Sequence, residues 1–131
     1  MFLSSLTLDQ KKCFLGLAKE ILIADDGKID QHEEAYLNGL CSEMSLSFND
    51  ESQIEKSQLV KIFDETEVKR VVLLELVALG YSNGSYDNAQ DKYTDDMANT
   101  LGIPMPDLRE IEALLKEYYS FQNKFIEFIE K

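Results

Sequence analysis

The chain has 131 residues, of which 44% are hydrophobic, and its 25 acidic and 13 basic residues give a formal net charge of −12. This length fits one domain large enough to bury a core, and the apolar content argues against a disordered chain. Nucleic acids and anionic membranes attract basic surfaces, so the charge disfavours both as partners. It favours a soluble protein, a cation binder, or a protein that docks something basic.

Two helices are predicted in the first third of the chain. The first begins at Thr7, with Gln10 three residues later completing a capping box, and stops at Gly27. The second opens at Asp30, where Glu33 completes another capping box. A loop is predicted over residues 45–49.

The middle of the chain predicts a helix with a weak apolar pattern, followed by a strongly apolar helix. The weak helix starts near residue 49 or 50 and runs to about Phe63. Asp64 and Glu67 then predict a third capping box and the start of a fourth helix. Because this fourth helix is apolar on nearly every side between Val68 and Leu79, we expect it to be the central and most buried one.

The last third predicts two more helices. After a turn over residues 81–84, Asp87 and Gln90 predict the cap of a fifth helix that ends near Leu101. Residues 102–106 contain both prolines and break the chain, and a long helix follows over about residues 107–130.

One passage of the sequence occurs twice. Residues 21–36 and 78–93 share a glycine, an aspartate and a tyrosine at matching positions. The duplication predicts an all-α fold: a six-helix bundle built from a duplicated helix-turn-helix hairpin plus a long C-terminal helix. Repeat one is placed at about 8–46, repeat two at about 65–103 and the C-terminal helix at about 107–130, within a single domain of residues 1–131.

Acidic side chains surround the first glycine turn. They are Asp25, Asp26, Asp30 and Glu33. Carboxylate oxygens suit Ca²⁺ or Mg²⁺, so a divalent-cation site at these four residues is one hypothesis. The alternative is that Asp30 and Glu33 only cap a helix while the other two are solvated. The loop is not an EF-hand, because apolar residues stand where its first two carboxylates are needed.

The second copy of the turn lacks most of this charge. Ser82, Asn83 and Gln90 are its neutral counterparts of two aspartates and a glutamate in the first copy. The caps survive there while the charge does not. A specific cation site is therefore expected in the first copy only.

Other reactive side chains are interpreted as structural. His32, the only histidine, is expected to be exposed near a helix start rather than to bind a ligand. Glu75, in the apolar fourth helix, is interpreted as a rim residue that is solvated or paired with a lysine, rather than as a catalytic carboxylate. Cys13 and Cys41 are expected to be small buried thiols in a reducing cytosol.

The C-terminal helix is rich in aromatic residues near its end. They are Tyr118, Tyr119, Phe121, Phe125 and Phe128. One interpretation places this helix across the bundle as part of the core. The other makes it a partner or self-association surface, because its apolar stripe is wider than one face. The stretch from about Phe121 onward is the part expected to extend past the core. The acidic residues of this helix argue against a helix that lies on a membrane.

The turn over residues 24–33 resembles the signature of TerB-like proteins, which include the tellurite-resistance protein TerB and the N-terminal domain of membrane-anchored DnaJ-type co-chaperones. The matching residues are Ala24, Asp26, Gly27, Asp30 and Glu33 in the first copy, with Gly84 and Asp87 in the second. The resemblance covers about residues 8–104. It implies an all-helical, non-enzymatic domain tied to stress response and tellurite resistance, with acidic turns proposed to bind metal ions. The neutral second turn argues against a two-site metal role.

The sequence therefore predicts a cytoplasmic, non-enzymatic, TerB-like helical binding module with a divalent-cation site at Asp25, Asp26, Asp30 and Glu33. The alternative is a structural or scaffolding protein that self-associates or docks a protein partner through its C-terminal helix, without metal. Neither hypothesis involves nucleic acid or a membrane. An enzyme is disfavoured, because no nucleophile elbow, phosphate loop, dinucleotide fingerprint or HExxH helix is present.

Overall fold

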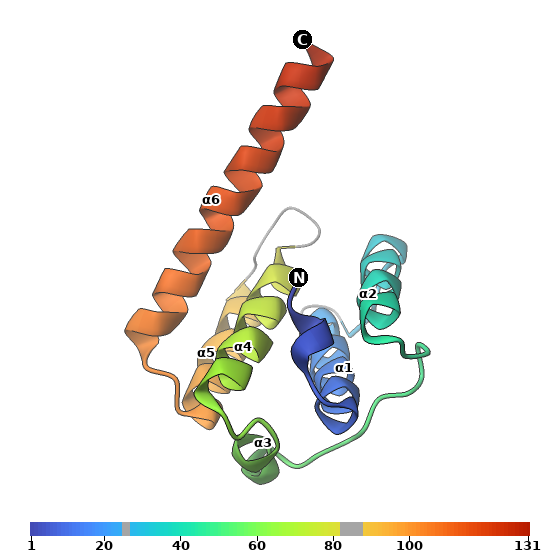
Figure 1. Ribbon diagram of the computed structural model, residues 1–131, viewed down its shortest axis with the longest axis vertical. Coiled ribbons are helices and arrows are strands. Elements are labelled where there is room, and N and C mark those ends of the chain that lie inside the picture. Colours follow the sequence, from blue (N-terminus) through green and yellow to red (C-terminus); the bar gives the residue numbers. More distant parts are fainter. Residues whose placement is uncertain (25–26, 82–87) are drawn as a thin grey trace.

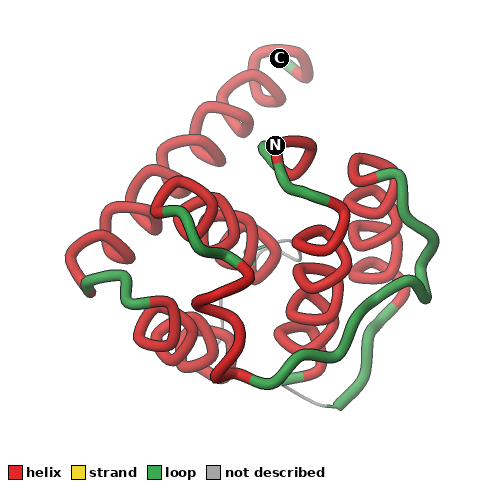
Figure 2. Tube along the Cα trace, turned by 60° about the horizontal axis from the view of Figure 1, so that its bottom comes forward, coloured by secondary structure: helices red, strands yellow, loops and turns green. Residues whose placement is uncertain are grey.

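The computed structural model describes residues 1–24, 27–81 and 88–131. Every regular element in these residues is helical, which confirms the predicted all-α bundle (Figure 1 and Figure 2). The elements in chain order are η1 (Leu3–Ser5), α1 (Leu8–Ile23), α2 (Gln31–Met44), α3 (Lys56–Ile62), α4 (Thr66–Gly80), α5 (Asn88–Leu101) and α6 (Met105–Glu130).

Helix α4 is the centre of the fold, as its composition predicts. It packs against α1, α5, α6 and η1. Its fully buried side chains include Val72, Leu73, Leu76, Val77 and Leu79. Burying one such side chain contributes about 1.5–3 kcal/mol, so this helix supplies a large share of the hydrophobic stabilisation. The other helices are arranged to cover it.

The start of α1 and the first glycine turn follow the sequence closely. The Thr7 hydroxyl accepts the Gln10 N–H at 3.2 Å, and the Gln10 side chain accepts the Thr7 N–H at 2.9 Å, so the predicted capping box is confirmed. Helix α1 itself ends at Ile23, earlier than expected. Gly27 adopts φ 78°, in the left-handed region that favours glycine, and its N–H donates to the Ile23 carbonyl at 2.9 Å.

The predicted start of the third helix is wrong. Helix α3 begins at Lys56, and the residues before it run as irregular chain along α1. The Ser52 N–H donates to the Lys12 carbonyl at 3.1 Å, and the Lys19 ammonium reaches the Phe48 carbonyl and the Glu51 carboxylate. These contacts satisfy backbone and charged groups of residues 48–52 and hold this part of the chain against α1 in a non-helical path.

The predicted capping box at Asp64 and Glu67 is also wrong. Helix α4 is capped by Glu65, and no side chain accepts a hydrogen bond at this position. Asp64 therefore lies one residue too early to act as the cap, and its carbonyl instead accepts the Lys69 ammonium at 3.3 Å. The predicted cap at Asp87 lies outside the described residues. Helix α6 begins two residues earlier than predicted and accommodates Pro106 in its first turn.

Gly16 allows the loop before α3 to approach α1 closely. A Cβ on this residue would lie 2.8 Å from the Ser52 carbonyl oxygen. We therefore expect Gly16→Ala to lower the free energy of unfolding by about 1–3 kcal/mol through overpacking. Gly39 in α2 is the matched control, because a Cβ there would meet nothing within 4 Å. Gly39→Ala should raise stability by about 0.5–1 kcal/mol. Urea unfolding of both variants measures this, and equal effects would contradict the close approach.

Candidate functional site

The structure brings together two of the four predicted cation ligands, and it does so in a capping box. The Asp30 carboxylate accepts the Glu33 N–H at 2.7 Å, and the Glu33 carboxylate accepts the Asp30 N–H at 3.1 Å. Asp25 and Asp26 lie outside the described residues. Within the part of the chain that the structure describes, no three His, Cys, Asp or Glu side chains form a group able to hold a metal ion. The cation site stays a prediction, and the capping role of Asp30 and Glu33 is confirmed.

Thermal melts of metal-stripped protein with and without Ca²⁺, Mg²⁺, Mn²⁺ and Zn²⁺ test the cation site. A site in the first turn predicts that a cation at 100 times its dissociation constant adds about 2.7 kcal/mol to the stability of the parent. The Asp25→Asn, Asp26→Asn double variant keeps the capping box and should lose this gain. Equal changes in the stability of parent and variant would contradict a cation site in this turn.

Glu75 is buried, which corrects its interpretation as a solvated or lysine-paired rim residue. Its side chain is 2% exposed. One carboxylate oxygen accepts the Phe2 N–H at 2.8 Å and lies 2.8 Å from the Met1 amino group. That amino group is also 3.2 Å from Glu43. The interaction was invisible in the sequence, because its partner is the first residue of the chain, which η1 folds back over α4.

The contact with Glu75 fixes the N-terminal segment against the core. Burial alone would lower the pKa of the Met1 amino group, but hydrogen bonds and charge from Glu75 and Glu43 outweigh burial, so this pKa is raised. The Leu3 N–H donates to the other oxygen of Glu43 at 2.9 Å, and Leu3 is fully buried. The Glu75 carboxylate therefore has a structural task, and Phe2 is held at the surface beside α4.

The remaining reactive side chains are placed as the sequence predicts. His32 is exposed in the first turn of α2. Cys13 and Cys41 are buried and free. Burial, assisted by the charge of Glu20, raises the pKa of the Cys13 thiol to about 11, and burial also raises the pKa of Cys41. Because the thiolate is the nucleophile, burial disfavours reaction at both cysteines.

The first half of α6 is part of the core. Leu108, Ile111 and Leu115 are buried against α4 and α5. The Tyr119 ring lies 5.9 Å, centroid to centroid, from the ring of Tyr81 at the end of α4. This part of the helix matches the interpretation of α6 as a helix that closes the bundle.

The second half of α6 stands clear of the other helices (Figure 1), and every residue from 120 to 131 is exposed. Along α6, five exposed apolar side chains recur at alternating spacings of four and three residues, and Ile126 and Ile129 are exposed beside them. We call this row the α6 stripe: Leu114, Tyr118, Phe121, Phe125 and Phe128, which are 54, 42, 59, 66 and 75% exposed. This is the extension past the core that the sequence predicts from about Phe121 onward.

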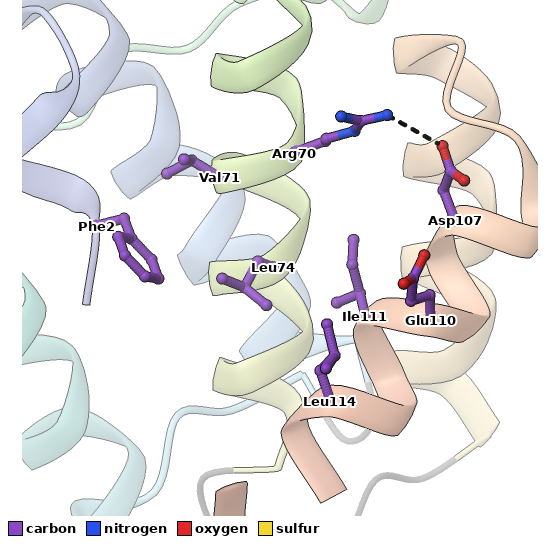
Figure 3. Close-up of a pocket in the computed structure, with 8 residues that line it drawn as sticks. All are labelled: Phe2, Arg70, Val71, Leu74, Asp107, Glu110, Ile111 and Leu114. Atoms are coloured by element: carbon purple, nitrogen blue, oxygen red, sulfur yellow. Dashed lines mark ion pairs between the residues drawn. The ribbon is translucent and has the colours of Figure 1, made fainter. Parts of the chain in front are cut away.

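A groove lies at the foot of the α6 stripe, between α6, α4 and the N-terminal segment (Figure 3). Its volume is about 420 Å³. Its apolar wall is formed by Phe2, Val71, Leu74, Ile111 and Leu114, and an ion pair of 3.7 Å between Arg70 and Asp107 lies at one end. Leu114 belongs to both the groove and the stripe, so the two form one continuous apolar surface. Sequence patterns missed the groove because it joins the two ends of the chain.

Comparison of the chain with models of protein families, with curated proteins and with solved structures finds no match. The likeness to TerB-like proteins rests on the turn motif and stays a prediction. Among the described residues, no helix has both the length and the apolar character needed to cross a bilayer.

Proposed function

We propose that this protein is a non-enzymatic helical interaction module that binds a helix of another polypeptide along the α6 stripe. The observation that supports it most strongly is the exposure of the stripe. Phe121, Phe125 and Phe128 are each more than half exposed on a helix that the fold holds away from the core. Large apolar side chains that are contiguous at a surface mark interaction sites in soluble proteins.

The spacing of the stripe favours a helix as the partner. Apolar residues that alternate at three and four positions form a seam along one side of a helix. The seam from Leu114 to Phe128 is about 21 Å long at 1.5 Å per residue. An amphipathic helix matches a straight apolar seam of this length with residues spaced in the same way.

Aromatic residues suit an interface better than they suit solvent. Tyr118, Phe121, Phe125 and Phe128 each offer about 150–250 Å² when fully buried. With the exposures given above, these four side chains would bury roughly 350–600 Å². A standard interface buries about 800 Å² on each partner. These four side chains alone would therefore supply less than the area of a standard interface, and the groove at the foot of the stripe adds further apolar surface to it.

The proposal agrees with the non-enzymatic domain that the TerB-like resemblance implies, and it does not depend on the cation site. In the part of the chain that the structure describes, the side chains singled out as possible catalytic or metal-binding groups have structural roles. Glu75 holds the N-terminal segment, Asp30 and Glu33 cap α2, and both thiols are buried. By contrast, the stripe residues from Phe121 to Phe128 remain more than half exposed.

Photo-crosslinking in the cells that make this protein tests the proposal. A benzoyl-phenylalanine in place of Phe125 should form a discrete protein adduct, because the stripe is covered by a partner. The control is the same group in place of Asn123, which is exposed on the opposite side of α6, since two residues are about 200° apart around a helix. The adduct's mass separates a second copy from a different protein. No adduct at 125, or equal adducts at both positions, would contradict the proposal.

A further inference from the structure

We propose that the partner on the α6 stripe is a second copy of this chain, bound antiparallel through the same stripe about a twofold axis. This inference rests on the proposed function and names its partner. Three observations carry it: the order of charges beside the stripe, the groove at its foot, and the charge of this part of α6.

The first observation is the order of charges along one flank of the stripe. The flanking residues are Glu110, Glu117, Lys124 and Lys131, one every seven residues. Acidic residues thus flank the half of α6 that packs on the body, and lysines flank the half that projects. In paired helices these flanking positions face one another and set the orientation.

An antiparallel pair makes this order complementary to itself. When Tyr118 lies opposite Phe121 of the second copy, Leu114 lies opposite Phe125. The same register sets Glu117 beside Lys124 of the second copy, and the twofold axis repeats each contact. A parallel pair would set Glu117 beside Gln122 and form no such charge pair. The flanking charges therefore select the antiparallel arrangement.

The groove supplies the second observation, because the same register brings Phe128 of the second copy to Ile111. Ile111 lies in the apolar wall of the groove, which also holds Phe2, Val71 and Leu74 (Figure 3). The apolar ring of Phe128 suits the apolar side chains of this wall. In the single chain, Phe128 is 75% exposed. The projecting end of each copy would thus cover the open groove of the other, as a twofold interface requires.

The third observation is that this part of α6 carries no net charge. Residues 113–131 hold three lysines and three glutamates, although the whole chain has a net charge of −12. A surface meant for a strongly basic partner would be acidic like the rest of the molecule. A balanced surface lets two copies approach without like-charge repulsion at the contact.

Charge exchange tests the register on the full-length protein. Light scattering across a concentration series should show a dimer of the 15.0 kDa chain. Glu117→Lys and Lys124→Glu should each weaken dimerisation about tenfold, because each places like charges together twice. The double variant should restore dimerisation.

Glu127→Lys, which makes the same charge change away from the stripe, is the control and should leave the dimer unchanged. Circular dichroism checks that each exposed-site variant stays helical. Failure of the double variant to recover would overturn the register.

Disulfide trapping tests the orientation. Leu114→Cys and Phe125→Cys chains, mixed under an oxidising glutathione buffer, should form the mixed disulfide if the pair is antiparallel. Native Cys13 and Cys41 are buried and should not interfere. Disulfides between identical positions would overturn the antiparallel pair.

A folded chain whose mass stays at 15.0 kDa at every concentration would overturn the proposal that the partner is a second copy. In that case a crosslinked adduct with a different protein at position 125 would still uphold the proposed function.

Discussion

Most of the surface of helix α4 has to be covered, because the helix is apolar nearly all round, and the rest of the structure follows from this constraint. α1, α5 and η1 cover most of it, and the first half of α6 packs against it as well. The buried carboxylate of Glu75 is the one charge on this helix that the core accommodates, and it does so by receiving the Phe2 amide and the Met1 amino group. The covering of α4 thus also fixes the N-terminal segment.

The same constraint separates α6 into two parts with different tasks. Before Tyr119 the helix buries Leu108, Ile111 and Leu115 within the bundle while Leu114 and Tyr118 stay exposed, and beyond Tyr119 every side chain is exposed. Residues 120–130 continue a helix that is already formed, but they are exposed and so lack the tertiary packing from which most helical stability in proteins comes. A row of phenylalanines on such a segment gains stability from a partner that buries it. Function is therefore proposed at the point where the core stops using α6.

Local patterns in the sequence were sufficient for most helices, the capping boxes at Thr7 and Asp30, and the central place of α4. They were insufficient wherever a distant segment decided the conformation. The start of α3 was missed because Ser52 bonds to Lys12 in α1. Local patterns place Glu75 wrongly because its partner, Met1, is distant in the sequence. The exposed end of α6 could be predicted from its excess of aromatic residues, whereas the groove required Phe2 and Leu114 to be brought together by folding.

Amide hydrogen exchange over residues 120–130, measured at low and high protein concentration, tests the central claim most directly. The claim is that a partner helix covers the α6 stripe, and that the partner is a second copy. It predicts that these amides exchange rapidly in dilute protein and become protected as the concentration rises, while α4 stays protected throughout. Exchange over residues 120–130 that is the same at every concentration would contradict it.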